Sequence, residues 1–175
     1  MFENIDNIYN KIAIMLTQNQ NLAKLLYYPD KDALSKPDLT QEQIFGMLDQ
    51  NNIEGCRIFN IAPTYYVTEK QRAEIRIYEA EVSARNEYVG RIRYSFDIVC
   101  HQELWTLADG RRRVMQIASA IVKQLNGKDV GSIGKFGFYD GRRPDVFKYQ
   151  FYNDVMTGYK LFGFLNVGTD SNECY

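Results

Sequence analysis

Residues 91–105 read RIRYSFDIVCHQELW, and this stretch decides the fold. From Ile92 to Cys100 every second residue is apolar. The residues that alternate with them are mostly polar, and they include Arg91, Arg93, Ser95 and Asp97. Because successive side chains of a strand point to opposite faces, the pattern predicts a strand with one buried face and one face in water. We expect Arg91, Arg93 and Asp97 to line the wet face, where they are available for contact with a partner.

The end of this stretch contains the single histidine and the single tryptophan of the chain, and one of its three cysteines. Neighbouring strand residues point to opposite faces, which disfavours Cys100 and His101 as a nucleophile–base pair. One histidine and three scattered cysteines also give no zinc-ligand spacing. We therefore interpret residues 94–105 as a junction from strand to helix, with Trp105 covering an edge of the core.

Helical patterns lie on both sides of this strand. Residues 111–126 carry an apolar stripe at helical spacing, and Gly127 is placed to end that helix. Residues 5–26 show the same spacing, with a polar break at 17–21 and an end before Pro29. Thr40 and Gln43 form a capping box that opens a short helix.

Further strands are expected at 57–67, where Pro63 favours an edge position, and at 72–83, where the alternation changes phase after Ile77 as at a β-bulge. An aromatic C-terminal quarter predicts more strands and a hairpin. The predicted class is α+β, a mostly antiparallel β-sheet (a meander plus a C-terminal hairpin) packed by two main α-helices. We expect a single domain over 1–175, with an arm and short helix at 29–55 and a flexible tail at 168–175.

Composition narrows the function classes. The chain has 175 residues, 45% of them hydrophobic, which is enough for a core without disulfide or metal support. The net charge is −1, whereas proteins that bind nucleic acid without sequence specificity usually carry a basic excess. No signal peptide and no stretch of roughly 20 apolar residues is evident, so we expect no membrane association. The three cysteines are expected to be free thiols in a reducing compartment.

Enzymatic alternatives are weaker. The glycine-rich residues 131–137 lack the ending of a phosphate-binding loop, and are better interpreted as a turn into a strand. The strongest rival is a magnesium-dependent nuclease with the order helix, three strands, helix, strand, whose carboxylates would hold the metal. Its candidate residues are Asp38, Glu74 and Arg76. The Pro-Asp step at Asp38 falls in a predicted loop and Arg stands where such enzymes carry Lys, so we expect no catalytic residues, metal or cofactor.

Two segments are candidate contact surfaces. Residues 27–40 combine two tyrosines with alternating charges, and either form a local loop or an arm that docks on a neighbour; the arm candidates are Tyr27, Tyr28, Asp30 and Asp32. Residues 111–113 are three arginines at a helix N-terminus, where the helix dipole disfavours cations. Arg111, Arg112 and Arg113 are therefore either a solvated face or a basic surface for an acidic partner.

The element order helix, arm, meander, helix, strands, with YSFDIVCHQELWTL followed at once by DGRRRVMQIASAIVKQL, resembles the tail terminator and neck (tail completion) proteins of tailed bacteriophages. The similarity covers roughly residues 57–140 and the first helix. The resemblance implies a structural virion protein of the neck or tail, assembled in the host cytoplasm. A host adaptor domain that forms no ring is a further alternative.

The resemblance also implies partners. Such proteins form a ring, commonly a hexamer, that joins the tail tube protein to the head–tail connector proteins, and DNA passes through the lumen without sequence-specific contacts. A ring needs two unlike surfaces that meet head to tail. We expect the arm at 29–55 and the arginines at 111–113 to be those two surfaces.

Overall fold

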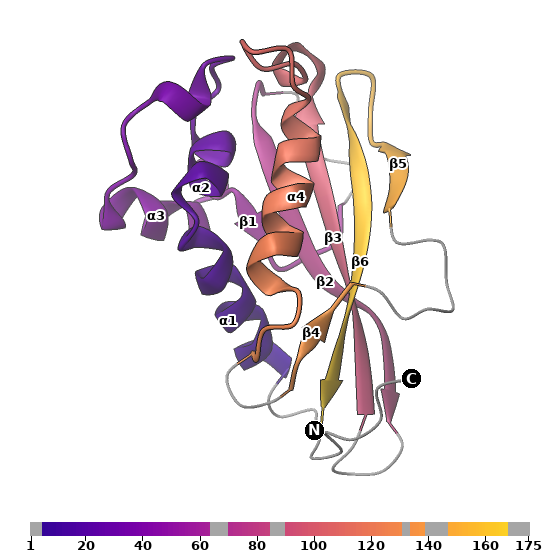
Figure 1. The fold of residues 1–175 in the computed structure, drawn as a ribbon. Helices are drawn as coiled ribbons and strands as arrows, with labels where there is room; N and C mark the ends of the chain where they lie inside the picture. The colour runs from indigo at the N-terminus through magenta and orange to yellow at the C-terminus, as the bar shows by residue number, and fades with distance from the viewer. Residues whose placement is uncertain (1–4, 64–69, 85–89, 131–133, 139–146, 168–175) are drawn as a thin grey trace.

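A computed structural model describes residues 5–63, 70–84, 90–130, 134–138 and 147–167, and its fold is α+β (Figure 1). The predicted fold class is therefore confirmed. In chain order the helices and strands are α1 (Ile5–Thr17), α2 (Gln20–Tyr27), the 3-10 turn η2 (Ala33–Ser35), α3 (Gln41–Leu48), β1 (Ile58–Phe59), β2 (Ala73–Ala84), β3 (Gly90–His101), the 3-10 turn η3 (Gln102–Leu104), α4 (Arg113–Leu125), β4 (Phe136–Gly137), β5 (Phe147–Phe151) and β6 (Met156–Val167).

The strands form one sheet in the order β1-β2-β3-β6-β4, and β5 pairs with β6 beside β4. The pairs are antiparallel except for β1 with β2, which is parallel. The central strand β3 pairs along its whole length with β6, from Gly90 opposite Val167 to His101 opposite Met156. The sheet therefore has β1 at one edge and β4 with β5 at the other.

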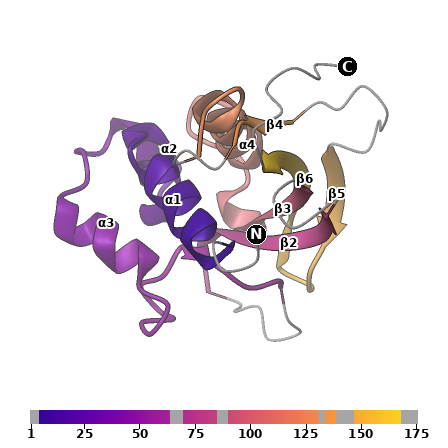
Figure 2. The same ribbon diagram turned by 90° about the horizontal axis from the view of Figure 1, so that it is seen from below.

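Helices α1, α2 and α4 pack on one face of this sheet (Figure 2). The core between the two layers holds the predicted inward residues of β3 together with Phe136 and Phe138. The Phe96 ring lies 5.8 Å from the Phe136 ring and 5.9 Å from the Phe138 ring, centroid to centroid. Gly163 makes room for this aromatic cluster, because a Cβ atom there would lie 2.2 Å from Cε1 of Phe136. The aromatic cluster therefore packs directly against the backbone of β6 at Gly163.

The N-terminal helices break where the sequence predicts. Asn19 accepts a hydrogen bond from the Leu22 amide and starts α2, which ends before Pro29. Thr40 and Gln43 form the predicted capping box of α3. Gly127, with a φ of 73°, follows the end of α4, as expected for a residue that reverses the chain after a helix. No described helix is long and apolar enough to cross a membrane.

Three elements differ from expectation. The strand predicted over 57–67 is limited to β1, and residues 64–69 lie outside the described part. The bulge in β2 falls between Glu79 and Glu81, so Tyr78 faces the side away from the helices. Helix α4 starts at Arg113, two residues later than expected, because the Leu107 amide bonds to the Arg111 carbonyl in a preceding turn. The predicted tail, 168–175, also lies outside the described residues.

Candidate interaction surfaces

The sheet face opposite the helices is polar, but much of it is buried. It is formed by alternate residues of three strands: Glu74, Arg76 and Tyr78 of β2, Ser95 and Asp97 of β3, and Lys160 of β6. Ser95 is fully buried and Asp97 is 1% exposed. The prediction of a wet face is therefore wrong for this end of β3, and Asp97 is not accessible to a partner. A strand that is buried on both faces still alternates in polarity when its polar side chains pair with one another.

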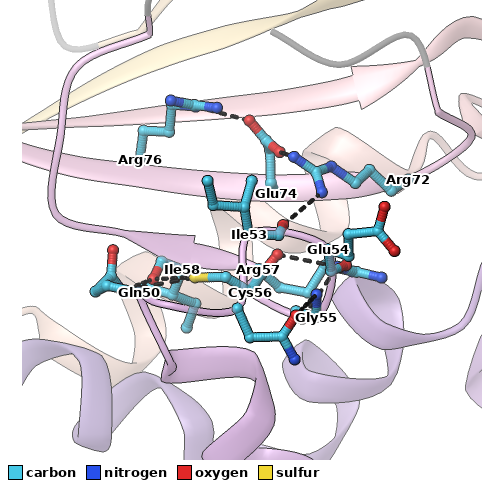
Figure 3. Close-up of polar contacts among 11 residues, drawn as sticks. Gln50, Ile53, Glu54, Gly55, Cys56, Arg57, Ile58, Arg72, Glu74 and Arg76 are labelled. Carbon is cyan, nitrogen blue, oxygen red and sulfur yellow. Dashed lines mark hydrogen bonds and ion pairs between the residues drawn. The ribbon is translucent and has the colours of Figure 1, made fainter.

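Glu74 is the centre of one such group, near the β1 edge (Figure 3). Its carboxylate lies 2.7 Å from a guanidinium nitrogen of Arg72 and 2.7 Å from Nε of Arg76. The Phe59 ring lies under both cations, 4.6 Å from the Arg76 guanidinium carbon and 5.6 Å from that of Arg72. Arg72 also donates to the Ile53 carbonyl. The carboxylate is thus committed to internal partners.

Asp97 is the centre of a second group. It accepts hydrogen bonds from the hydroxyls of Ser95 at 2.8 Å and Tyr78 at 3.3 Å, and lies 3.4 Å from the Lys160 ammonium. Burial raises the pKa of Asp97, and the Ser95 hydroxyl and the Lys160 ammonium oppose that effect. Burial and the nearby Asp97 charge raise the pKa of Tyr152. The group links β2, β3 and β6 across the sheet.

Arg91 and Arg93 continue this face toward the other end of the sheet. The Arg91 guanidinium lies 3.9 Å from the centroid of the Phe164 ring, and that of Arg93 lies 4.0 Å from the Phe162 ring. Both side chains are half-buried. They remain candidate contact residues, now with their guanidinium groups resting on β6 aromatic rings.

Arg113 is fully buried, so the prediction that it belongs to a basic contact surface is wrong. Its guanidinium donates to the carbonyl oxygens of Leu104 at 3.1 Å, Leu25 at 2.7 Å and Tyr28 at 3.0 Å, and also to that of Asp30. Burial lowers the pKa of this arginine. Arg113 therefore joins α4 to the end of α2. Only Arg111 and Arg112 of the predicted cluster are exposed.

The segment predicted as an arm folds onto its own chain. The ring of Tyr27 meets that of Tyr28 edge-on at 5.1 Å, and the Tyr28 hydroxyl donates to the Pro37 carbonyl. Asp30 and Asp32 both face Lys36, at 3.6 and 3.5 Å. The structure thus favours the local loop over the docking arm, and the four candidates stabilise that loop.

The strand–helix junction is confirmed at residues 94–105. Cys100 lies in the core, and burial raises the pKa of its thiol to about 12. Nδ1 of His101 accepts a hydrogen bond from the Glu103 amide and so caps η3. Trp105 packs against the core and stacks on Tyr159, with ring centroids 6.1 Å apart. The thiol and the imidazole therefore have separate structural roles.

The carboxylates of the nuclease alternative do not share a site. Asp38 lies 2.7 Å from the Lys24 ammonium in the loop before α3, whereas Glu74 pairs with Arg72 and Arg76 in the sheet. In the ranges that the structure describes, no three His, Cys, Asp or Glu residues converge as metal ligands. Arg76 serves as the partner of Glu74 and as a cation over Phe59.

Among the described residues, five of the seven exposed large apolar side chains belong to segments at two opposite edges of the sheet, and the other two are Ile14 and Val82. We call the first group the α3 surface: Phe45 (68% exposed), Ile53 and Ile61. The second, the β5 surface, consists of the exposed Tyr149 and Phe151 with the partly buried Trp105, Phe147 and Tyr159. Phe147 and Tyr159 stack at 4.3 Å, and Tyr149 meets Tyr159 edge-on at 5.7 Å. Figure 1 shows α3 and β5 on opposite sides of the molecule.

The β5 surface was not predicted as a contact site. The α3 surface lies largely within the arm and short helix predicted over 29–55, but its exposed apolar residues were not among the candidates. The sequence does indicate aromatic strands over 147–165, but alternation alone does not show that β5 lies at an edge with no helix above Tyr149. An edge position follows from the pairing order, which depends on contacts between distant segments. The available signal was the hairpin itself, because the outer strand of a C-terminal hairpin often ends a sheet.

This arrangement is typical of an α+β protein whose accessible apolar groups are suited to contact with other proteins. Comparison with known families indicates a phage-related protein. The sequence profile of the YomW family matches residues 19–162, and the chain belongs to this family. No curated protein matches the chain, and no solved structure does.

Proposed function

We propose that this protein is a structural virion protein of a phage neck or tail, a tail terminator or tail completion subunit that forms a ring. The observation that carries the proposal is the placement of exposed apolar side chains at both edges of one sheet. An assembly subunit needs at least two contact surfaces, and exposed aromatic groups are the side chains most enriched in protein interfaces.

The charged groups of the sheet agree with this function. The buried carboxylates of Glu74 and Asp97 are held by cations and hydroxyls of the same chain. These contacts join the strands of the sheet, and neither of these two carboxylates is available for a divalent ion. A sheet joined by internal ion pairs, with exposed apolar side chains at its edges, suits a subunit of an assembly better than it suits an enzyme.

In this function the ring, a hexamer by resemblance, joins the tail tube protein to the head–tail connector proteins. The half-buried Arg91 and Arg93 are the candidates to face such an axial partner or the DNA that passes through the lumen. Their contact with DNA would be to phosphate and so independent of base sequence.

The test is the mass of the purified protein in solution. Native mass spectrometry at micromolar concentration should show a closed species near six times the 20.4 kDa subunit mass, and negative-stain electron microscopy should show rings. A strict monomer at every salt and protein concentration would contradict the proposal. A magnesium-dependent DNA nicking assay with Glu74→Ala as control tests the nuclease alternative. Cleavage by the wild type but not by the variant would favour a nuclease.

A further inference from the structure

We infer that the α3 surface and the β5 surface are the two halves of one interface, each meeting the other on a second copy of this chain. The inference rests on the proposed function, and it names the contact that closes the ring. The two surfaces lie at opposite edges of the same sheet, beyond β1 and beyond β6. A subunit with unlike surfaces on opposite sides associates head to tail, and such contacts generate rings when the rotation closes.

Exposed carboxylates lie beside the α3 surface, and an exposed guanidinium lies beside the β5 surface. On α3, Glu42 and Phe45 are three residues apart and so lie on one helix face, and Asp49 follows directly after the last residue of the helix. These two carboxylates and that of Glu54 are exposed beside the α3 surface. Glu54 pairs with Lys70, so Glu42 and Asp49 supply the negative charge.

Beside the β5 surface Arg112 is an exposed cation. Arg112 is next to Trp105 in space, because Thr106 and Arg112 form a β-bridge and the Arg113 amide bonds to the Trp105 carbonyl. Arg111 is neutralised by Asp109. The basic contact surface predicted at residues 111–113 is thereby reduced to Arg112. The acidic surface that it would meet is assigned to α3 and no longer to the loop at 27–40.

The two sheet edges also differ in their backbone. At the β1 edge the Ile58 carbonyl already accepts from the Tyr9 hydroxyl and the Gln50 amide. At the β5 edge the Tyr152 amide bonds to the Met156 carbonyl, so by the alternation of an antiparallel pair the Gln150 and Lys148 amides point to β6. The amides of Tyr149 and Phe151 point outward, and among the described strands only β6 pairs with β5. The β5 edge can therefore donate backbone hydrogen bonds to a partner.

A complementation experiment tests the pairing. The β5 variant carries Tyr149→Ser and Phe151→Ser, and the α3 variant carries Phe45→Ser and Ile53→Ser. Each variant keeps one intact surface, so each should be monomeric alone by native mass spectrometry. Their equimolar mixture should give a 1:1 dimer and nothing larger, because the contact that remains cannot propagate.

Ile14→Ser is the matched control, since Ile14 is a comparably exposed apolar residue on α1, away from both surfaces, and it should assemble as the wild type does. Circular dichroism melting checks that each variant is folded. If a double substitution unfolds the chain, the charge reversals Arg112→Glu and Glu42→Arg replace it. Each should weaken association at low salt, and their equimolar mixture should assemble again, because every contact between unlike variants pairs opposite charges.

Three outcomes would overturn the pairing: a variant that assembles alone as the wild type does, a variant that forms dimers alone, or a mixture that stays monomeric. Failure of the wild type itself to assemble would instead overturn the proposed function. The two failures are therefore distinguishable.

Discussion

The corner where α4 meets α2 and the edge formed by β5 use their residues in opposite ways. At the corner, the guanidinium of Arg113 donates to four backbone carbonyls and is fully buried. At the edge, Tyr149 and Phe151 are each 57% exposed, and their amides point away from β6. The difference teaches that charge in the sequence is a poor guide to which residues are accessible, because Arg113 is buried between α4 and α2 whereas the aromatic residues of β5 are exposed.

Removing the corner arginine should have the largest effect. Arg113→Met leaves buried carbonyls without donors at about 1–3 kcal/mol each, so we expect a loss of about 4 kcal/mol in the free energy of unfolding. Urea titration followed by circular dichroism measures it. Arg111→Met is the control, because Arg111 is exposed and its exposed pair with Asp109 contributes little, so the midpoint should stay nearly unchanged. Equal effects of the two substitutions would show that Arg113 is not the closing group.

A smaller loss is expected in the sheet. Glu74→Gln leaves Arg72 and Arg76 buried with less compensation, and breaking a buried ion pair in this way costs about 3 kcal/mol. The exposed pair of Glu54 with Lys70 gives the control, and Glu54→Gln should have no measurable effect on the same urea midpoint. A stabilised Glu74→Gln variant would mean that the carboxylate serves another purpose than joining its two arginines.

Next in size is the glycine beneath the aromatic cluster. Gly163→Ala places a methyl group against the Phe136 ring, and overpacking of this kind costs about 2 kcal/mol. Gly137→Ala is the matched control on the neighbouring strand β4, where a Cβ atom meets nothing within 4 Å. The melting temperature of Gly163→Ala should be lower than that of Gly137→Ala. Identical melting temperatures would contradict the packing of the Phe136 ring against Gly163.

The smallest effect concerns the buried thiols. Burial raises the pKa of Cys56 to about 11 and that of Cys100 to about 12, above the pKa of 9.0 of a thiol in the unfolded chain. The folded protein therefore holds these protons more tightly, so the stability they contribute is complete below pH 9 and falls as the pH rises from 9 toward 12. In a Cys174→Ser variant at pH 8, Ellman's reagent should find no reactive thiol until denaturant is added. Rapid modification of the native protein would contradict their burial.

Local patterns predicted much of this fold because their causes are local. The break at Asn19, the capping box at Thr40 and the strand at 90–101 follow from hydrogen bonding and alternation within a few residues. The fate of Arg113 could not be read in this way, since its acceptors at Leu25 and Tyr28 are more than 80 residues away. The burial of Asp97 depends likewise on Lys160 and Tyr78 from two other strands.

The residues predicted to form contact surfaces differ in their accessibility. Arg111 and Arg112 are exposed as expected, whereas Tyr27 and Asp30 stabilise a loop. The exposed aromatic residues of β5 were assigned to a hairpin but not to an edge, because pairing order is set by the whole sheet.

The most direct test of the account is hydrogen exchange of the β5 peptide, residues 147–151, as a function of protein concentration. If the β5 edge contacts the α3 surface of a second copy, amide exchange at Tyr149 and Phe151 should slow as the protein assembles, and peptides covering 41–61 should be protected in parallel. Exchange at both segments that stays fast and independent of concentration, while rings are visible, would contradict the account.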